Sequence, residues 1–107
     1  MAQLPQYLAG HRDTYMGIAS ALAEGKLPQV DGYNLLRPVF RGLTGDPAFV
    51  AWLNEQVESL SGGQYHLAES SVRPKSLGMA MNLDLTGPNG TKRLRMGPYN
   101  PGFRWDE

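Results

Sequence analysis

The chain has 107 residues, with ten lysines and arginines balanced by ten aspartates and glutamates, so its formal net charge is zero. This balance argues against a dedicated nucleic-acid-binding domain, because such domains are usually clearly basic. The absence of cysteine excludes disulfides, thiolate metal ligands and a cysteine nucleophile. An apolar fraction of 41% and a charged fraction of 19% are ordinary for a globular protein, and we expect a single domain over residues 1–107.

The first predicted element is a helix over about residues 5–24. Pro5 suits a first helical turn, Gly25 offers a left-handed cap, and Pro28 prevents continuation. Between them, apolar residues recur at helical spacing along one stripe: Leu8, Tyr15, Ile18 and Leu22.

One or two further helices complete a helical part over about residues 5–60. Asp31 could begin a short helix, but Pro38 disfavours a regular helix there. The next helix has a stronger start signal, since Asp46 suits the N-cap and Pro47 the first position. Its apolar face is formed by Phe49, Leu53, Val57 and Leu60, before Gly62 and Gly63 end it.

The apolar period then changes from helical to alternating, which predicts a hairpin part over about residues 64–96. A short strand is expected at Tyr65–Leu67, a longer one at residues 77–85, and a return strand at residues 92–96 after the turn at Asn89-Gly90.

Two registers of the hairpin satisfy face alternation. A four-residue loop would pair Leu83 with Leu94 and Asp84 with Arg93. A two-residue Asn-Gly loop would pair Leu85 with Leu94 and Asp84 with Arg95. In both registers Asp84, the one acidic residue of the hairpin, faces an arginine.

These elements predict an α+β fold, in which two or three N-terminal helices pack on a small antiparallel sheet that contains a C-terminal β-hairpin. The tail, residues 97–107, shows no regular period and is expected to be extended or coiled.

Charge is divided along the chain. From residue 42 to 69 there are four acidic residues and no basic one, whereas from residue 70 to 104 there are six basic residues and one acidic. The basic stretch could attract an acidic partner.

Within it, candidate partner-binding residues are the basic hairpin residues and the tail, where tyrosine, tryptophan and arginine are common interface anchors. Two alternatives stay open: the arginines could merely solvate the hairpin, and the aromatic side chains could fold back onto the protein's own core. The candidates are Lys92, Arg93, Arg95, Tyr99, Phe103, Arg104 and Trp105, with Arg73 and Lys75 as possible phosphate contacts.

Leu60–Gln64 resembles the signature pentapeptide of ABC-transporter ATPases, a segment that opens a helix and contacts nucleotide in that family. The sequence contains no GxxxxGK[ST] phosphate-binding loop, and the five residues fall where a helix should end. We therefore interpret them as a glycine-rich helix stop.

Other chemistry has little support in the sequence. His11 and His66 lack further ligands at metal-binding spacing, and no nucleophile elbow supports a triad of Ser61, His66 and Glu69. We therefore expect no enzyme, metal or cofactor. The N-terminus lacks the pattern of a signal peptide and no apolar stretch could span a bilayer, so a cytoplasmic or otherwise intracellular location is expected.

The leading hypothesis is a non-enzymatic protein-interaction module, such as an assembly subunit, adaptor or inhibitor. It would bind a protein partner or neighbouring subunit through the basic hairpin face and the aromatic C-terminal arm. The alternative is a nucleic-acid-binding accessory protein that contacts phosphates through the same hairpin.

Overall fold

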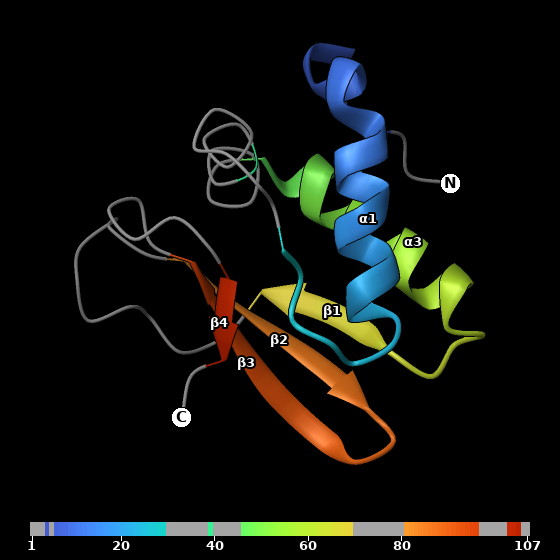
Figure 1. The fold of residues 1–107 in the computed structure, drawn as a ribbon, viewed down its shortest axis with the longest axis vertical. Helices are drawn as coiled ribbons and strands as arrows, with labels where there is room; N and C mark the ends of the chain where they lie inside the picture. Colours follow the sequence, from blue (N-terminus) through green and yellow to red (C-terminus); the bar gives the residue numbers. More distant parts are fainter. Residues whose placement is uncertain are drawn as a thin grey trace.

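A computed structural model of the chain describes residues 4, 6–29, 39, 46–69, 81–96 and 103–105. The described residues form two α-helices, α1 and α3, and a four-stranded antiparallel sheet, which confirms the α+β class (Figure 1). The elements in chain order are a 3-10 helix Gln6–His11, α1 Arg12–Leu22, α3 Pro47–Leu60, β1 His66–Glu69, β2 Met81–Gly87, β3 Gly90–Met96 and β4 Phe103–Trp105.

The predicted first helix is divided, because its initial turns form the 3-10 helix and only α1 is α-helical. The division at His11 directly follows Gly10, whose backbone freedom disfavours helix. The predicted stripe is otherwise confirmed for Tyr15, Ile18 and Leu22, which are all buried. Gly25 has a φ of +72°, as a left-handed residue after a helix should.

The helix α3 begins as predicted. The Asp46 side chain accepts a hydrogen bond from the backbone N–H of Ala48 at 3.0 Å, and Pro47 is the first helical residue. Phe49, Leu53 and Val57 are buried as the stripe requires, but Leu60 is 51% exposed and lies outside the core.

The Leu60–Gln64 segment ends α3. Gly62 and Gly63 have φ values of +65° and +83°, and the N–H of Gly63 donates to the carbonyl of Glu58 at 2.8 Å. This is the glycine stop that the sequence predicted. The doubtful helix at residues 31–40 lies outside the described residues except for Val39, which is buried in the core.

The sheet has the order β1-β2-β3-β4. The first predicted register is correct, since Leu83 is opposite Leu94 and Asp84 is opposite Arg93. That register assumed a loop of four residues. Gly87 also pairs with Gly90, so the strands are longer than expected and only two residues remain in the loop. Residues 77–80 of the predicted strand lie outside the described residues.

The tail was expected to be extended or coiled, and Phe103–Trp105 are extended, but the sequence did not predict that they would join the sheet. These residues form β4 and pair antiparallel with β3, placing Phe103 opposite Met96, Arg104 opposite Arg95, and Trp105 opposite Leu94. Three residues are too few to show a period, and the neighbouring strand decides their conformation. The prediction for the remainder of the tail lies outside the described residues.

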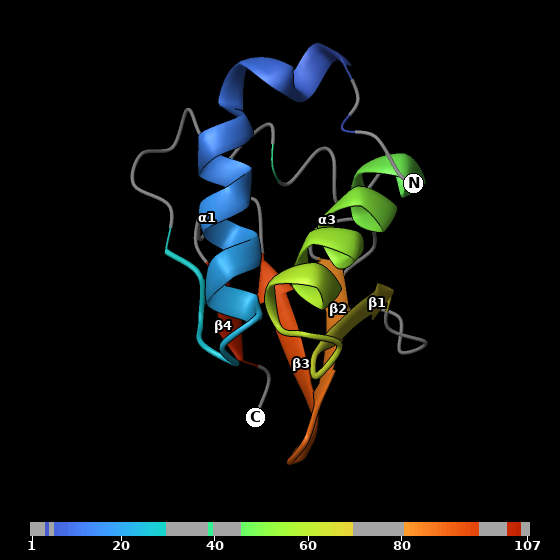
Figure 2. The same ribbon diagram turned by 90° about the vertical axis from the view of Figure 1, so that its right-hand side faces the viewer.

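Both helices lie on the same side of the sheet and pack against each other (Figure 2). Their buried faces meet five inward-facing residues of the strands in one hydrophobic core. These five are Leu67, Leu83, Leu85, Leu94 and Phe103. Among the described residues, neither helix has the length and apolarity that a membrane crossing requires.

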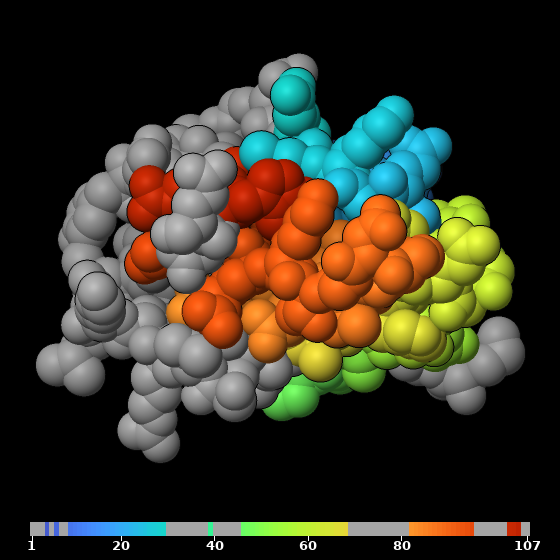
Figure 3. Space-filling view, turned by 90° about the horizontal axis from the view of Figure 1, so that it is seen from below, coloured from blue at the N-terminus to red at the C-terminus, as the bar shows by residue number. Residues whose placement is uncertain are grey.

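Both margins of the sheet have neighbours. At β1, the backbone N–H of Leu67 donates to Oδ1 of Asn54 on α3 at 2.6 Å. The helix therefore supplies a hydrogen-bond acceptor to a backbone donor that points away from β2. At the other margin, the segment Leu27–Gln29 passes beside β4 (Figures 1 and 3), and Pro28 within it is buried.

Candidate interaction surface

The sheet has one apolar and one polar face. Paired residues on neighbouring strands share a face, and successive residues of one strand alternate between the two faces. Because the buried leucines face α1 and α3, the residues that alternate with them face the other side of the sheet. We call this side the outer face; in the described part of the chain no helix covers it. By strand pairing its residues are Ala68, Asn82, Asp84, Thr86, Thr91, Arg93, Arg95 and Arg104, together with His66, whose ring reaches Glu58 of α3 at the edge of the sheet.

Arg93 has a counter-ion within the sheet. Its Nε lies 3.4 Å from Oδ1 of Asp84, the residue directly opposite on β2, and the two side chains are 31% and 25% exposed. The expectation that Asp84 faces an arginine is therefore confirmed, and Arg93 is that arginine. Much of its charge is compensated by its own sheet.

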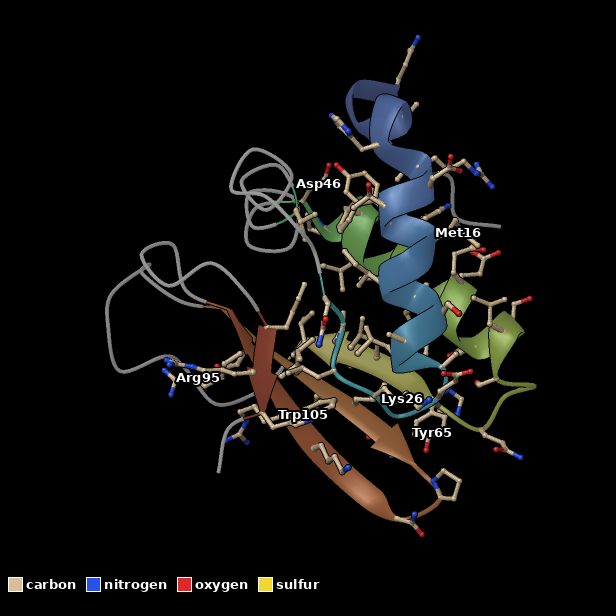
Figure 4. The ribbon with its side chains drawn as sticks, viewed as in Figure 1. Met16, Lys26, Asp46, Tyr65, Arg95 and Trp105 are labelled. Carbon is tan, nitrogen blue, oxygen red and sulfur yellow. The ribbon has the colours of Figure 1, made fainter. Side chains whose placement is uncertain are left out.

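The next pairing along the outer face brings two arginines together. Arg95 on β3 lies directly opposite Arg104 on β4, and opposite the neutral Asn82 on its other side. Arg104 is exposed and makes no ion pair with any other residue that the structure describes. In Figure 4 the Arg95 side chain extends away from the helices. Like charges placed directly opposite each other destabilise a sheet.

Three of the predicted partner-binding residues, Lys92, Phe103 and Trp105, lie on the opposite, helix-side face. Lys92 pairs with buried Leu85, and its ammonium lies 5.4 Å from the centre of the Trp105 ring. Trp105 is half-buried and packs against the core. This cation–π contact holds the Lys92 side chain on the helix side of the sheet, away from the arginines of the outer face.

Phe103 follows the core alternative that the sequence left open. Its side chain is 7% exposed and belongs to the same hydrophobic cluster as the buried leucines of β2 and β3. The structure therefore brings together Arg93, Arg95 and Arg104, and separates them from Lys92, Phe103 and Trp105. Tyr99, Arg73 and Lys75 lie outside the described residues.

A polar network between α3 and β1 was not predicted. Asn54 donates from Nδ2 to Oε1 of Glu58 at 3.1 Å, and Nδ1 of His66 lies 2.8 Å from the same oxygen. The hydrogen bond with His66, followed by that with Asn54, lowers the pKa of Glu58 from its ordinary value of 4.5. The four-residue spacing of Asn54 and Glu58 was a signal for their contact, whereas the approach of His66 needs the fold.

The residues considered for catalysis serve other contacts. The Ser61 hydroxyl donates to the carbonyl of Glu58 at 3.3 Å and accepts from the N–H of Tyr65 at 3.0 Å, which ties it to the end of α3. His66 is engaged with Glu58. Among the described residues, no three histidine or carboxylate side chains gather as a metal site would require.

Comparisons of the chain with models of protein families, with curated proteins and with solved structures find no match. The outer face therefore has to be interpreted from its own chemistry. Among the described residues of this face, three arginines and one aspartate leave an excess of two positive charges. Such a surface can bind anions, with guanidinium groups acting as planar hydrogen-bond donors.

Proposed function

We propose that this chain is a non-enzymatic protein-interaction module that binds an acidic surface of a partner protein through the outer face of its sheet. Arg93, Arg95 and Arg104 are the contacting residues. The module would serve as an assembly subunit, an adaptor or an inhibitor. The observation that carries this proposal is the direct opposition of Arg95 and Arg104 on neighbouring strands.

The opposition has an energetic consequence. A glutamine at either position would keep the strand pairing without the repulsion between two guanidinium groups. An acidic side chain of a partner that binds beside Arg104 would weaken this repulsion. The concentration of positive charge in this row therefore favours an acidic partner.

A protein partner fits the surface better than single-stranded nucleic acid does. Sequence-tolerant binding of single strands combines basic residues with aromatic rings on which bases stack. Among the described residues, the outer face carries no phenylalanine, tyrosine or tryptophan, and Trp105 lies on the helix side beneath Lys92. The arginines are then the only candidate phosphate contacts among the described residues of this face, so nucleic acid stays the second candidate.

Fluorescence anisotropy tests the proposal with two labelled probes, a short glutamate-rich peptide and a single-stranded oligonucleotide of equal charge. The peptide should bind the wild-type protein more tightly, and Arg104→Glu should abolish that binding. Arg12→Glu is the matched control, because Arg12 is an exposed arginine of α1 and its reversal changes the net charge equally.

Three results would reject the proposal. Stronger binding of the oligonucleotide, with a steep loss of affinity as salt increases, would replace the protein partner with nucleic acid. Equal effects of the two charge reversals would show an unspecific dependence on net charge. Failure of both probes to bind would leave the outer face without an anionic ligand.

A further inference from the structure

We infer that Asp84 is an internal competitor of the acidic partner and limits the affinity of the outer face for it. The inference rests on the proposed function and describes how binding at that same surface is regulated. A carboxylate of the partner would displace the Asp84 carboxylate from Arg93 and take its place beside the guanidinium group.

Strand pairing places the competitor within the group of arginines. Asp84 on β2 lies directly opposite Arg93 on β3, and on its other side it lies opposite Ala68 on β1. The two paired strands therefore hold the carboxylate beside the guanidinium group before any partner arrives. Among the described residues of the outer face Asp84 is the one acidic residue, so this side chain supplies the negative charge with which a partner has to compete.

The contact between Asp84 and Arg93 is longer than the best contacts of its kind. Nε of Arg93 lies 3.4 Å from Oδ1 of Asp84. Charge-assisted hydrogen bonds between arginine and a carboxylate are strongest at about 2.7–2.9 Å, and a bidentate carboxylate adds a second parallel bond. Asp84 is attached to β2 by a short side chain, whereas a carboxylate that approaches from outside the sheet can adopt the better geometry.

Both members of the pair are partly exposed. The Arg93 and Asp84 side chains are 31% and 25% exposed, and the neighbouring row toward the hairpin turn consists of exposed Thr86 and Thr91. Water screens such ion pairs, and each contributes little to the stability of a protein. Displacement of Asp84 therefore costs the fold little, and the displaced carboxylate can be hydrated.

A competitor within the sheet makes the surface selective for clustered carboxylates. A partner that offers one isolated carboxylate exchanges one ion pair for another and gains little affinity. A partner with several neighbouring carboxylates also meets Arg104, which is exposed, and gains that interaction in addition.

Fluorescence anisotropy with the glutamate-rich peptide tests the competition. Asp84→Asn keeps the size of the side chain, removes its charge and should tighten peptide binding by about two- to fivefold, the equivalent of one partly exposed ion pair. Glu24→Gln is the matched control. Glu24 forms an ion pair of the same length, 3.4 Å, with Lys26, but it follows α1 and is not part of the sheet. This control should leave the affinity almost unchanged.

The dependence on Arg93 separates competition from a general effect of charge. In an Arg93→Gln background Asp84 has lost the group for which it competes, so Asp84→Asn should tighten binding less than it does in the wild-type background. Measurement at physiological ionic strength screens the long-range effect of the removed charge. Circular dichroism confirms that each variant is folded.

A second readout follows the displacement in the wild-type protein. The Nε–Hε signal of Arg93 and the carboxyl-carbon signal of Asp84 should shift along the same binding curve in NMR spectra as the peptide is added. A peptide with glutamine in place of every glutamate should shift neither signal.

The outcomes separate the competition from the proposed function. Unchanged or weaker binding by Asp84→Asn would overturn the competition and leave the acidic-protein surface, as would an equal gain with Glu24→Gln or in the Arg93→Gln background. An Asp84 signal that stays constant while the Arg93 signal moves would also overturn it, because the carboxylate would then remain in place. Failure of both the wild-type protein and Asp84→Asn to bind the peptide would overturn both proposals.

Discussion

Leu67 and Asn54 are joined by a hydrogen bond of 2.6 Å, in which the backbone N–H of the strand donates to the side-chain oxygen of the helix. The bond satisfies an outward-facing donor at β1, the first strand of the sheet. Unsatisfied edge groups are a template for pairing with another chain. Asn54 therefore both fixes α3 against the sheet and protects its edge.

Replacement of Asn54 by alanine should lower the free energy of unfolding by about 1–2 kcal/mol, since it leaves a partly buried backbone donor without its partner. Chemical denaturation measures the loss. Ser59→Ala is the matched control, because Ser59 is exposed on the same helix and should stay within about 0.5 kcal/mol of wild type. Equal stabilities of the two variants would contradict the assigned role of Asn54.

Glu58 should make stability depend on pH in the acidic range. Its pKa is lower in the folded protein than its ordinary value of 4.5, through hydrogen bonds with His66 and Asn54. The folded state therefore prefers the ionised form, and this contribution is fully present above pH 4.5 and is lost as the pH falls through the folded pKa.

Urea unfolding of wild type and Glu58→Gln at a series of pH values tests this linkage. The wild-type protein should be the more stable at neutral pH, and the difference should shrink with acidification until both curves meet. A difference that stays constant with pH would mean that the glutamate acts only through its packing.

The helices and the hairpin were predictable because their signals are local. Asp46 with Pro47 marks the start of α3, and the alternation around Leu83 marks the inward face of β2. Face alternation also restricted the hairpin to two registers, one of which is observed. The change from 3-10 helix to α-helix at His11 was not predicted. The low helix propensity of Gly10 indicates that a helix is weak there, but it does not specify a 3-10 turn.

The site was less predictable because it depends on strand pairing between distant residues. The arginines were identified as candidates, but their grouping needed β4, whose three residues carry too little pattern to be recognised as a strand. Lys92 was grouped with the arginines because it is close to them in the sequence. Its neighbours in sequence lie on the outer face, while parity places its side chain with Trp105 on the other side.

Two glycines should respond oppositely to alanine. Gly87 is the last residue of β2, and a Cβ there would collide with the half-buried ring of Tyr65. Gly87→Ala should therefore lower the free energy of unfolding by about 1–3 kcal/mol. Gly17 is exposed in α1 with open space around it, and Gly17→Ala should raise stability by about 0.5–1 kcal/mol. Thermal unfolding would show midpoints moving in opposite directions; a shared direction would contradict the assigned position of the ring.

Phe103 should be a core residue in a stability measurement. Phe103→Ala should lower the free energy of unfolding by about 3–5 kcal/mol, the usual effect of removing a buried phenylalanine. Arg104→Ala, one residue further along β4, should change stability little because its side chain is exposed. If Phe103→Ala were as stable as wild type and lost only partner binding, the aromatic arm would contact the partner instead of the core.

The arginines of the outer face should divide into one that stabilises the fold and one that destabilises it. Arg93→Gln breaks the pair with Asp84 and should lower stability by up to about 1 kcal/mol. Arg104→Gln removes a charge opposite Arg95 and should raise stability by about 0.2–0.5 kcal/mol. Both effects should diminish in high salt, because screening weakens attraction and repulsion alike.

The same Arg104→Gln variant should bind the acidic peptide less tightly than wild type. A variant that is more stable and less able to bind identifies a residue kept for the complex at the expense of the fold. Denaturation and anisotropy on one preparation measure both quantities. Loss of stability in Arg104→Gln would mean that Arg104 already has a stabilising contact in the free protein, and the opposition of the two arginines would then carry no argument for binding.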